Sequence, residues 1–405
     1  MIKVMSKVFT KPFTQQEPVP SAAISRITEI LATGRLHRYN TIKGEISDAS
    51  MLEKEFAEWQ GTQYCLATTS GGQAMQISLR AAGVKPGTKV LANAYTLAPV
   101  PGAIHATGGI PVFVDIDDNW HTDINDLEEK AKDSGAQYFM LSHMRGHIAN
   151  MERIVAVCKK YSITLIEDCA HTMGAKWKGK RSGNFGDIAC FSTQTYKHLN
   201  SGEGGFITTD NPEFAARAIV NSGSYMLYGS HGAIPSENIF KKVRLESPNC
   251  SARLDNIRAA ILRAQLPLLE ENILRWQSLY EALEEGFRAI PGLKVVKREP
   301  CEQFVGSSIQ FQASGIREDN IPLLVKRCEN RGVQLKWFGN PEPTAFTSKY
   351  DTWQYLGEIA DLPNTDRVLS KTCDMRVPLT FSKEDCFDII EIIADEVHKL
   401  TNKYS

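Results

Sequence analysis

The sequence lacks any hydrophobic run long enough to cross a membrane. No apolar stretch approaches the roughly 18 residues that a spanning helix needs. Residues 1–7 are interrupted by lysines and have no apolar core of the kind found in signal peptides. We therefore expect a cytoplasmic protein without a membrane partner.

Cysteine patterns that hold metals or disulfides are also absent. The nine cysteines are an odd number, are scattered along the chain, and include no Cys-x-x-Cys pair. This distribution fits a reducing compartment and supports neither a metal site nor a disulfide framework. An excess of one charge is missing as well, because the formal net charge is −1, so we expect no nucleic-acid partner.

The chain is too long for one ordinary hydrophobic core, and its composition is that of a globular protein. Apolar residues make up 42% and charged residues 23% of the 405 positions. We expect an arm with a helix near residues 22–33 within residues 1–50, and a large domain over residues 51–270. A linking helix and a smaller C-terminal α+β domain are expected over residues 271–405.

Short β-rich runs alternate with helical patterns from about residue 62 to residue 210. Several runs are apolar almost throughout, which is typical of strands covered on both faces. The alternation predicts an α/β domain with a mainly parallel, seven-stranded sheet, in which ligands bind beyond the carboxyl ends of the strands. The predicted strands are residues 64–68, 89–93, 111–115, 137–142, 164–167, 188–192 and 205–209, with helices over residues 73–82, 125–132 and 151–160.

A long helical pattern follows the sheet region. Apolar residues recur at three- and four-residue spacing from Leu254 to Leu268 and again from Ile273 to Phe287. Pro267 lies between the two stretches and is expected to kink or break the helix. Further elements are predicted over residues 307–312, 321–331 and 383–400.

An amine and a carboxylate follow two of the predicted strands. Asp168 ends an apolar run, and Lys197 lies between another strand and a Gly-rich turn. A pyridoxal phosphate site needs both groups, an amine that forms a Schiff base with the aldehyde and a carboxylate that pairs with the pyridinium nitrogen. Taken singly, Asp168 could equally be a helix cap or part of an ion pair, and Lys197 a solvated surface residue.

Other groups suit the same site. Ser70-Gly71-Gly72 follows a strand and opens a helix, where free N–H groups and the helix dipole favour a phosphate, although such a segment is often only a turn. Ser192 could present its hydroxyl to that phosphate. His171 could pack against the cofactor ring, hydrogen-bond its phenolic oxygen, or be an ordinary, partly buried histidine.

Three segments together, residues 167–175, residues 183–187 and residues 191–205, resemble the DegT/DnrJ/StrS-type sugar aminotransferases of the aspartate aminotransferase, fold type I superfamily. The resemblance implies that fold and pyridoxal 5'-phosphate as the cofactor. It also implies transfer of an amino group from an amino acid, commonly glutamate or glutamine, to a keto sugar, often nucleotide-linked, or to a cyclitol ketone. Family enzymes are homodimers with shared active sites.

The resemblance assigns roles residue by residue. Lys197 matches the Schiff-base lysine and Asp168 the partner of the pyridine nitrogen, while His171 stands where many members have glutamine. Ser192 matches a phosphate contact, and Gly71-Gly72 matches the phosphate turn, with glycine in place of the usual threonine.

Three further features depart from the family pattern. The ring-stacking aromatic is expected at Leu97, so either Leu97 covers the ring or Tyr95 has taken that role. Asn249 is the candidate for the phosphate ligand borrowed from the neighbouring subunit, although it lies four residues before Arg253 where two is commoner. Residues 334–340 do not match the usual substrate-site pattern, which leaves the acceptor open.

Other functions remain possible from the sequence. A family dehydratase has histidine in place of the Schiff-base lysine, so Lys197 argues against it. A non-catalytic regulator that binds the cofactor or a sugar is disfavoured by intact Lys197 and Asp168, and a dinucleotide-binding oxidoreductase by the missing Gly-x-Gly-x-x-Gly. Possible substrate contacts, equally well interpreted as surface or interface residues, are Arg38, Tyr39, Lys336 and Trp337.

Overall fold

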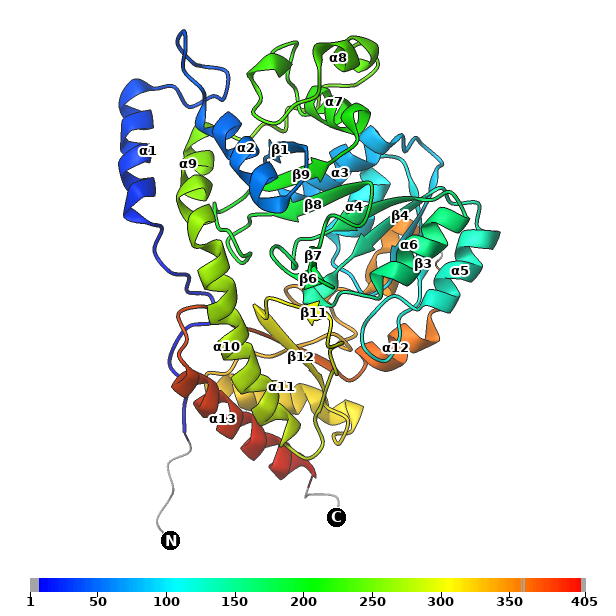
Figure 1. Cartoon of the computed structure of the whole chain (residues 1–405). Coiled ribbons are helices and arrows are strands. Elements are labelled where there is room, and N and C mark those ends of the chain that lie inside the picture. Colours follow the sequence, from blue (N-terminus) through cyan, green and yellow to red (C-terminus); the bar gives the residue numbers. More distant parts are fainter. Residues whose placement is uncertain (1–6, 358, 360, 402–405) are drawn as a thin grey trace.

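The computed structural model has a large α/β part and a smaller part, built on a second sheet, below it in the view of Figure 1. The structure describes residues 7–357, 359 and 361–401. Residues 1–6, on which the expectation of no signal peptide rests, lie outside the described residues. None of the described helices is both long enough and apolar enough to span a membrane.

Seven strands form the central sheet, in the order β1-β9-β8-β5-β4-β2-β3. Neighbouring strands run parallel from β8 to β3, whereas β9 is antiparallel to both β1 and β8. The prediction of a mainly parallel, seven-stranded sheet is therefore confirmed. The strands are β1 (Tyr64–Thr68), β2 (Lys89–Asn93), β3 (Ile110–Val114), β4 (Tyr138–Ser142), β5 (Thr164–Asp168), β8 (Ile188–Ser192) and β9 (Gly205–Thr209).

Helices cover both faces of this sheet, and each face has its own hydrophobic core. Successive side chains of a strand point to opposite faces, so Phe139 of β4 joins one core and Met140 the other. One core holds α2 (Asp48–Gln60), α5 (Ile124–Asp133), α6 (Met151–Lys160) and α9 (Asn256–Gln265). The other holds α3 (Gly71–Ala82), α4 (Pro99–Ala106), α7 (Pro212–Asn221) and α8 (Glu237–Val243).

A long helical segment connects the two parts of the molecule (Figure 1). It consists of α9, the 3-10 turn η3 (Leu266–Leu268) and α10 (Leu269–Arg288). Pro267 lies in η3, where its missing N–H and its ring interrupt the α-helical hydrogen bonding, so the predicted break is confirmed. The N-terminal helix α1 (Ser21–Thr33) packs along α9.

The smaller part is built on an antiparallel sheet of four strands in the order β10-β12-β14-β13. It has a third core, to which Phe287 of α10 and Phe311 of the sheet contribute. The division into an arm and two domains stays a prediction. The elements here are β10 (Lys294–Val295), β12 (Ser308–Gln312), α11 (Ile321–Asn330), β13 (Lys336–Trp337), α12 (Pro363–Leu369), β14 (Thr372–Arg376) and α13 (Lys383–Thr401), and β6 (Lys176–Trp177), β7 (Lys180–Arg181) and β11 (Glu302–Gln303) form a small third sheet.

Candidate active site

A cavity of about 310 Å³ opens where the carboxyl ends of three parallel strands meet the four-stranded antiparallel sheet. Ser142, Asp168 and Ser192 end β4, β5 and β8, and all three line the cavity. Ser308 and Arg376 line it from β12 and β14. The cavity therefore lies at the edge where a parallel sheet covered by helices binds its ligands.

Asp168 is buried at the end of β5 and is held in a fixed orientation. Its Oδ2 accepts a hydrogen bond from Ser142 Oγ at 2.9 Å, and its Oδ1 accepts one from the backbone N–H of Ala170 at 3.1 Å. Because a carboxylate has about four acceptor positions, Asp168 can still accept a hydrogen bond from a ligand. A protonated ring nitrogen is a donor of the required kind.

Lys197 and His171 face each other in this cavity, with 2.8 Å between Nζ and Nε2. Burial lowers the pKa of Lys197 to about 7, and the charge of Arg145 acts in the same direction, whereas Asp168 opposes it. Burial and the charge of Lys197 hold the pKa of His171 well below its usual value, so the neutral ring can accept a hydrogen bond from Nζ. A large share of Lys197 is therefore the neutral, nucleophilic amine near neutral pH.

The first turn of α3 forms a backbone cradle beside Ser192. Ser70 Oγ accepts a hydrogen bond from the N–H of Gln73 at 3.1 Å and so caps the helix. The N–H groups of Gly71 and Gly72 lie in the first turn, where a helix offers no internal acceptors, and they can bind an anion. A Cβ at Gly71 would lie 2.8 Å from Ser192 Cβ, so the close approach of α3 to β8 requires glycine there.

Of the two candidates for covering a cofactor ring, Leu97 lines the cavity and Tyr95 does not. Tyr95 is buried, with its ring centroid 5.3 Å from that of Phe338. Asn249 is exposed and lies outside the cavity of its own chain, where its Oδ1 accepts a hydrogen bond from the N–H of Ser251 at 3.0 Å. This position leaves Asn249 available to a neighbouring subunit.

A second buried carboxylate anchors the end of β5. Glu167 Oε2 accepts hydrogen bonds from His143 Nε2 and from the N–H of Gly183, both at 3.0 Å. Its Oε1 accepts from the N–H groups of Phe185 and Gly186 at 2.8 and 2.6 Å. Since its acceptor positions are occupied, Glu167 serves to position the strand end and has no capacity left for a metal ion.

Two arginines of the cavity wall were not predicted from the sequence. Arg145 lies in the 3-10 turn η1 (Met144–Gly146) with a φ of +55°, and Arg376 ends β14. Neither belongs to a motif, although the place of Arg145 just beyond the carboxyl end of β4 was an available signal. Of the suggested substrate contacts, Arg38 is fully buried and pairs with Glu53 through two hydrogen bonds of 2.8 Å, away from the cavity.

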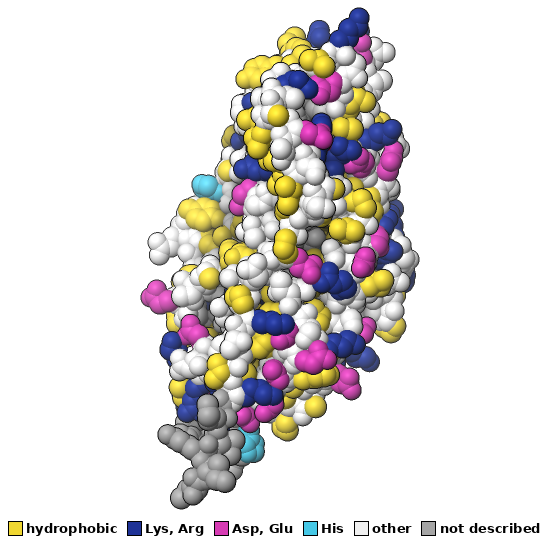
Figure 2. Space-filling model, turned by 90° about the vertical axis from the view of Figure 1, so that its left-hand side faces the viewer, with side chains coloured by type: hydrophobic (Ala, Val, Ile, Leu, Met, Phe, Trp, Pro, Cys, Tyr) yellow, Lys and Arg dark blue, Asp and Glu magenta, His cyan; other side chains and the backbone are white. Residues whose placement is uncertain are grey.

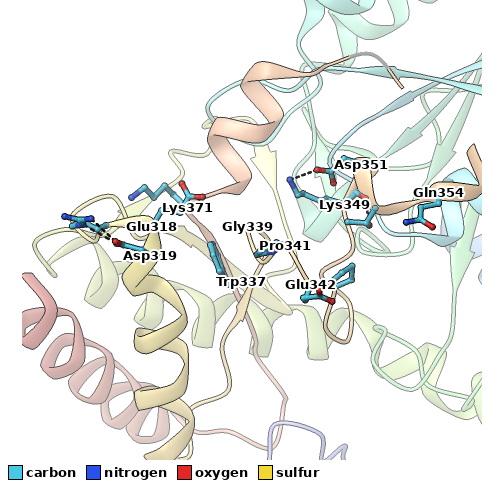
Figure 3. Close-up of a pocket in the computed structure, with 13 residues that line it drawn as sticks. Glu318, Asp319, Trp337, Gly339, Pro341, Glu342, Lys349, Asp351, Gln354 and Lys371 are labelled. Carbon is cyan, nitrogen blue, oxygen red and sulfur yellow. Dashed lines mark hydrogen bonds and ion pairs between the residues drawn. The ribbon is translucent and has the colours of Figure 1, made fainter. Parts of the chain in front are cut away.

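A larger cavity of about 1180 Å³ lies across the segment 341–354, which contributes residues to both cavities (Figure 3). Its charged groups are largely paired, as in the ion pairs Arg317–Asp319 and Lys349–Asp351, both at 2.8 Å. It contains neither Lys197 nor Asp168. The smaller cavity is therefore the candidate active site.

Known proteins resemble this chain over nearly its whole length. The model of the DegT/DnrJ/EryC1/StrS aminotransferase family matches residues 21–394. The chain is similar to the spore coat polysaccharide biosynthesis protein SpsC of Bacillus subtilis, with 27% identity over 386 residues, 92% of this chain and 94% of SpsC.

A second relative and a solved structure extend the comparison. The dTDP-3-amino-3,6-dideoxy-alpha-D-galactopyranose transaminase of Aneurinibacillus thermoaerophilus is 30% identical over 358 residues, which is 86% of this chain and 89% of that protein. The crystal structure of 3-amino-5-hydroxybenzoic acid synthase superposes with a TM-score of 0.81 at 25% identity, covering 97% of this chain and all of the other.

Proposed function

The chain belongs to the DegT/DnrJ/EryC1/StrS aminotransferase family, and from this premise we propose that it transfers an amino group from glutamate or glutamine to the ketone of a sugar or cyclitol. The observation that carries the proposal is the single cavity that brings together the amine of Lys197, the carboxylate of Asp168 and the cradle at Gly71. The relative from Aneurinibacillus is named for a dTDP-linked amino sugar, which favours a nucleotide-linked acceptor.

The cofactor is pyridoxal 5'-phosphate, and the residues present suit it. The first turn of α3 and Ser192 would hold the phosphate, Leu97 would cover the ring, and Asp168 would accept the proton of the ring nitrogen. Lys197 would hold the cofactor covalently through Nζ. When bound, the cofactor withdraws electrons from the substrate carbon that gains or loses a proton.

The chain's own groups then move and hold protons. Once the substrate's amine has displaced it from the cofactor, Lys197 Nζ, whose pKa is lowered to about 7 by burial, would take a proton from the substrate carbon and return it. His171 Nε2, 2.8 Å away, accepts a hydrogen bond from Nζ and keeps the amine oriented. Ser142 keeps the Asp168 carboxylate aligned, so its charge stays in place throughout the reaction.

We also propose a homodimer with shared active sites. The face that carries α1 exposes hydrophobic side chains among charged ones (Figure 2). Ile24 and Leu31 of α1 are each 56% exposed. Ile42 and Ile46 of the following loop are 63% and 62% exposed. Apolar surface of this kind suits contact with a second copy, which would receive Asn249 as a phosphate ligand. A cytoplasmic location is supported by the nine free cysteines.

Absorbance of the purified protein loaded with pyridoxal phosphate tests the function. We expect a band near the visible edge from the lysine-bound cofactor, which glutamate or glutamine converts to that of the amine form. Lys197→Ala should lose the band and the activity. A band and full activity retained in Lys197→Ala would contradict the assignment, and a band that no amino acid changes would favour the regulator.

A further inference from the structure

Three cationic side chains and one carboxylate lie close together where the four-stranded antiparallel sheet forms the cavity wall. In the pairing of β13 with β14, Lys336 lies opposite Asp374. Arg376 follows Asp374 by two residues on the same strand and so points to the same face. Arg145 reaches Asp374 from η1, beyond the end of β4. Segments far apart in the sequence thus build one charged cluster.

The cluster holds more positive charge than its carboxylate balances. Asp374 Oδ2 lies 3.0 Å from Arg145 Nη2 and 3.6 Å from Lys336 Nζ. Asp374 Oδ1 accepts a hydrogen bond from Gln310 Nε2 at 2.8 Å, and the residue is completely buried. Since three cations share one anion, a further anion would lower the cost of burying them.

Arg145 and Arg376 place this excess positive charge at the cavity. The Arg145 side chain is 9% exposed, and its Nε has no hydrogen-bond partner among the residues that the structure describes. The guanidinium group of Arg376 lies over Tyr196, 3.4 Å from the ring centroid, and this contact orients it. Both arginines line the same cavity as Lys197.

The cofactor phosphate is not the missing anion. Its proposed cradle at Gly71, Gly72 and Ser192 belongs to α3 and β8, whereas the cluster belongs to η1, β13 and β14. Arg145 lines the same cavity as Lys197, and after burial it is the charge that most lowers the pKa of that amine. The excess charge therefore lies where the substrate must sit.

We propose that Arg145 and Arg376 bind a carboxylate of the acceptor, so that the acceptor is an acidic ketone. This inference rests on the proposed aminotransferase function. Donor and acceptor occupy the cavity in turn, and the donor's α-carboxylate balances the arginines only in the first half-reaction. A neutral acceptor would leave both charges unbalanced in the second half-reaction, which is the type of mismatch that a site rejects strongly.

The two guanidinium groups suit an anionic ligand such as a carboxylate. Guanidinium groups are planar and pair with carboxylates through parallel N–H···O hydrogen bonds. Asp374 is a positioning residue in this arrangement, because its ion pair holds Arg145. Lys336 contacts Asp374, and neither of these two residues lines the cavity.

The test uses the holoenzyme, first converted to its amine form with glutamate and then freed of donor. The probes are 3-oxocyclohexane-1-carboxylate and its neutral amide, which differ only in charge at the group concerned. Binding is measured by calorimetry, and conversion by return of the lysine-bound absorbance. We expect the acid to be preferred by roughly 10- to 100-fold, the effect of one charge-assisted pair.

Two variants locate the preference. In Arg145→Gln and in Arg376→Gln, the affinity for the acid should fall close to the affinity for the amide. Arg145→Lys should keep part of the preference for the acid, because it keeps the charge. The control Lys349→Gln, in the larger cavity, should keep the wild-type preference. Retention of the lysine-bound absorbance band after loading shows that a variant is folded. If Arg145→Gln does not fold, Arg376→Gln still measures the preference for the acid independently.

Several results would overturn the inference. One is that the wild type binds acid and amide equally, or does not bind the acid. Another is that Arg145→Gln and Arg376→Gln both keep the wild-type preference, or lose only the conversion of the cofactor by glutamate. Failure of the proposed function is a separate result, because a wild-type protein that glutamate does not convert fails before any ketone is added.

Discussion

The fold changes the chemistry of Lys197. An ordinary lysine is charged at neutral pH, whereas burial next to Arg145 lowers the pKa of Lys197 to about 7. His171 and Asp168 share its cavity, one as a neutral acceptor and the other as a fixed carboxylate. The amine is thus available as a nucleophile and proton carrier without a separate base.

The pH dependence of cofactor capture follows from this shift. Only the neutral amine reacts, so capture of pyridoxal phosphate by the cofactor-free protein should speed up as pH rises through about 7 and then level off. Stopped-flow absorbance measures the rate. A rate that keeps rising tenfold per pH unit toward ~10.4, the value of an ordinary lysine, would show that the amine is not shifted.

Asp168→Asn removes a charge while keeping nearly the same shape. We expect turnover to fall by roughly 10²- to 10³-fold, because the neutral amide no longer stabilises a protonated ring nitrogen. Steady-state kinetics measure this, and loading measured by absorbance shows whether cofactor is still bound. Asp319→Asn, paired with Arg317 at the surface, is the control, and equal activity of the two variants would remove Asp168 from the mechanism.

At this scale the sequence predicted the residues that end strands and missed those that the tertiary structure brings in. Asp168 and Ser192 were found because a polar side chain closes an apolar run. Arg145 and Arg376 meet only through the approach of η1 to β14, which no local pattern records. Tyr95 and Leu97 stayed undecided because both lie in one turn, and only the structure shows which lines the cavity.

Among the elements, α3 must begin with a glycine. Gly71→Ala would place a Cβ 2.8 Å from Ser192 Cβ, so the helix start must move away from β8. We expect a loss of about 1–3 kcal/mol in stability and weaker cofactor binding. Thermal melts and cofactor titrations measure both.

Gly72→Ala is the matched control for this prediction. The Cβ of Gly72→Ala would meet only Ser70 Oγ, at an ordinary 3.8 Å, so this variant should bind the cofactor nearly as the wild type does. If the two variants bind the cofactor equally, the close contact with Ser192 is not what shapes the cradle.

Elements with regular apolar patterns were predicted closely, and interrupted ones were not. The strands of the large sheet differ from the predicted runs by at most one residue at either end, because both faces are buried and the runs are apolar. β14 was missed, since Asp374 and Arg376 break its apolar pattern. The charges that hide this strand are those that build the cluster at the cavity.

For the whole molecule, the proposed homodimer would complete each site with a residue of the other copy. Asn249→Ala should weaken cofactor binding even though Asn249 lies outside the cavity of its own chain. Mixing Asn249→Ala with Lys197→Ala under conditions that exchange subunits should restore roughly a quarter of wild-type activity, because half the dimers are mixed and each has one intact site.

Activity of the mixture settles the sharing of residues. No recovery from fully exchanged dimers would mean that Asn249 acts within its own chain, and full activity of Asn249→Ala alone would mean that Asn249 has no role. The sequence could not decide this, since an exposed asparagine carries no signal of what covers it.

The central claim is that Lys197 is the amine that holds the cofactor. Borohydride reduction of the loaded protein, followed by proteolysis and mass spectrometry, tests it most directly. We predict that the cofactor is found on the peptide that contains Lys197, and that prior treatment with glutamate removes the label. A label on any other lysine, or none on this peptide, would contradict the account.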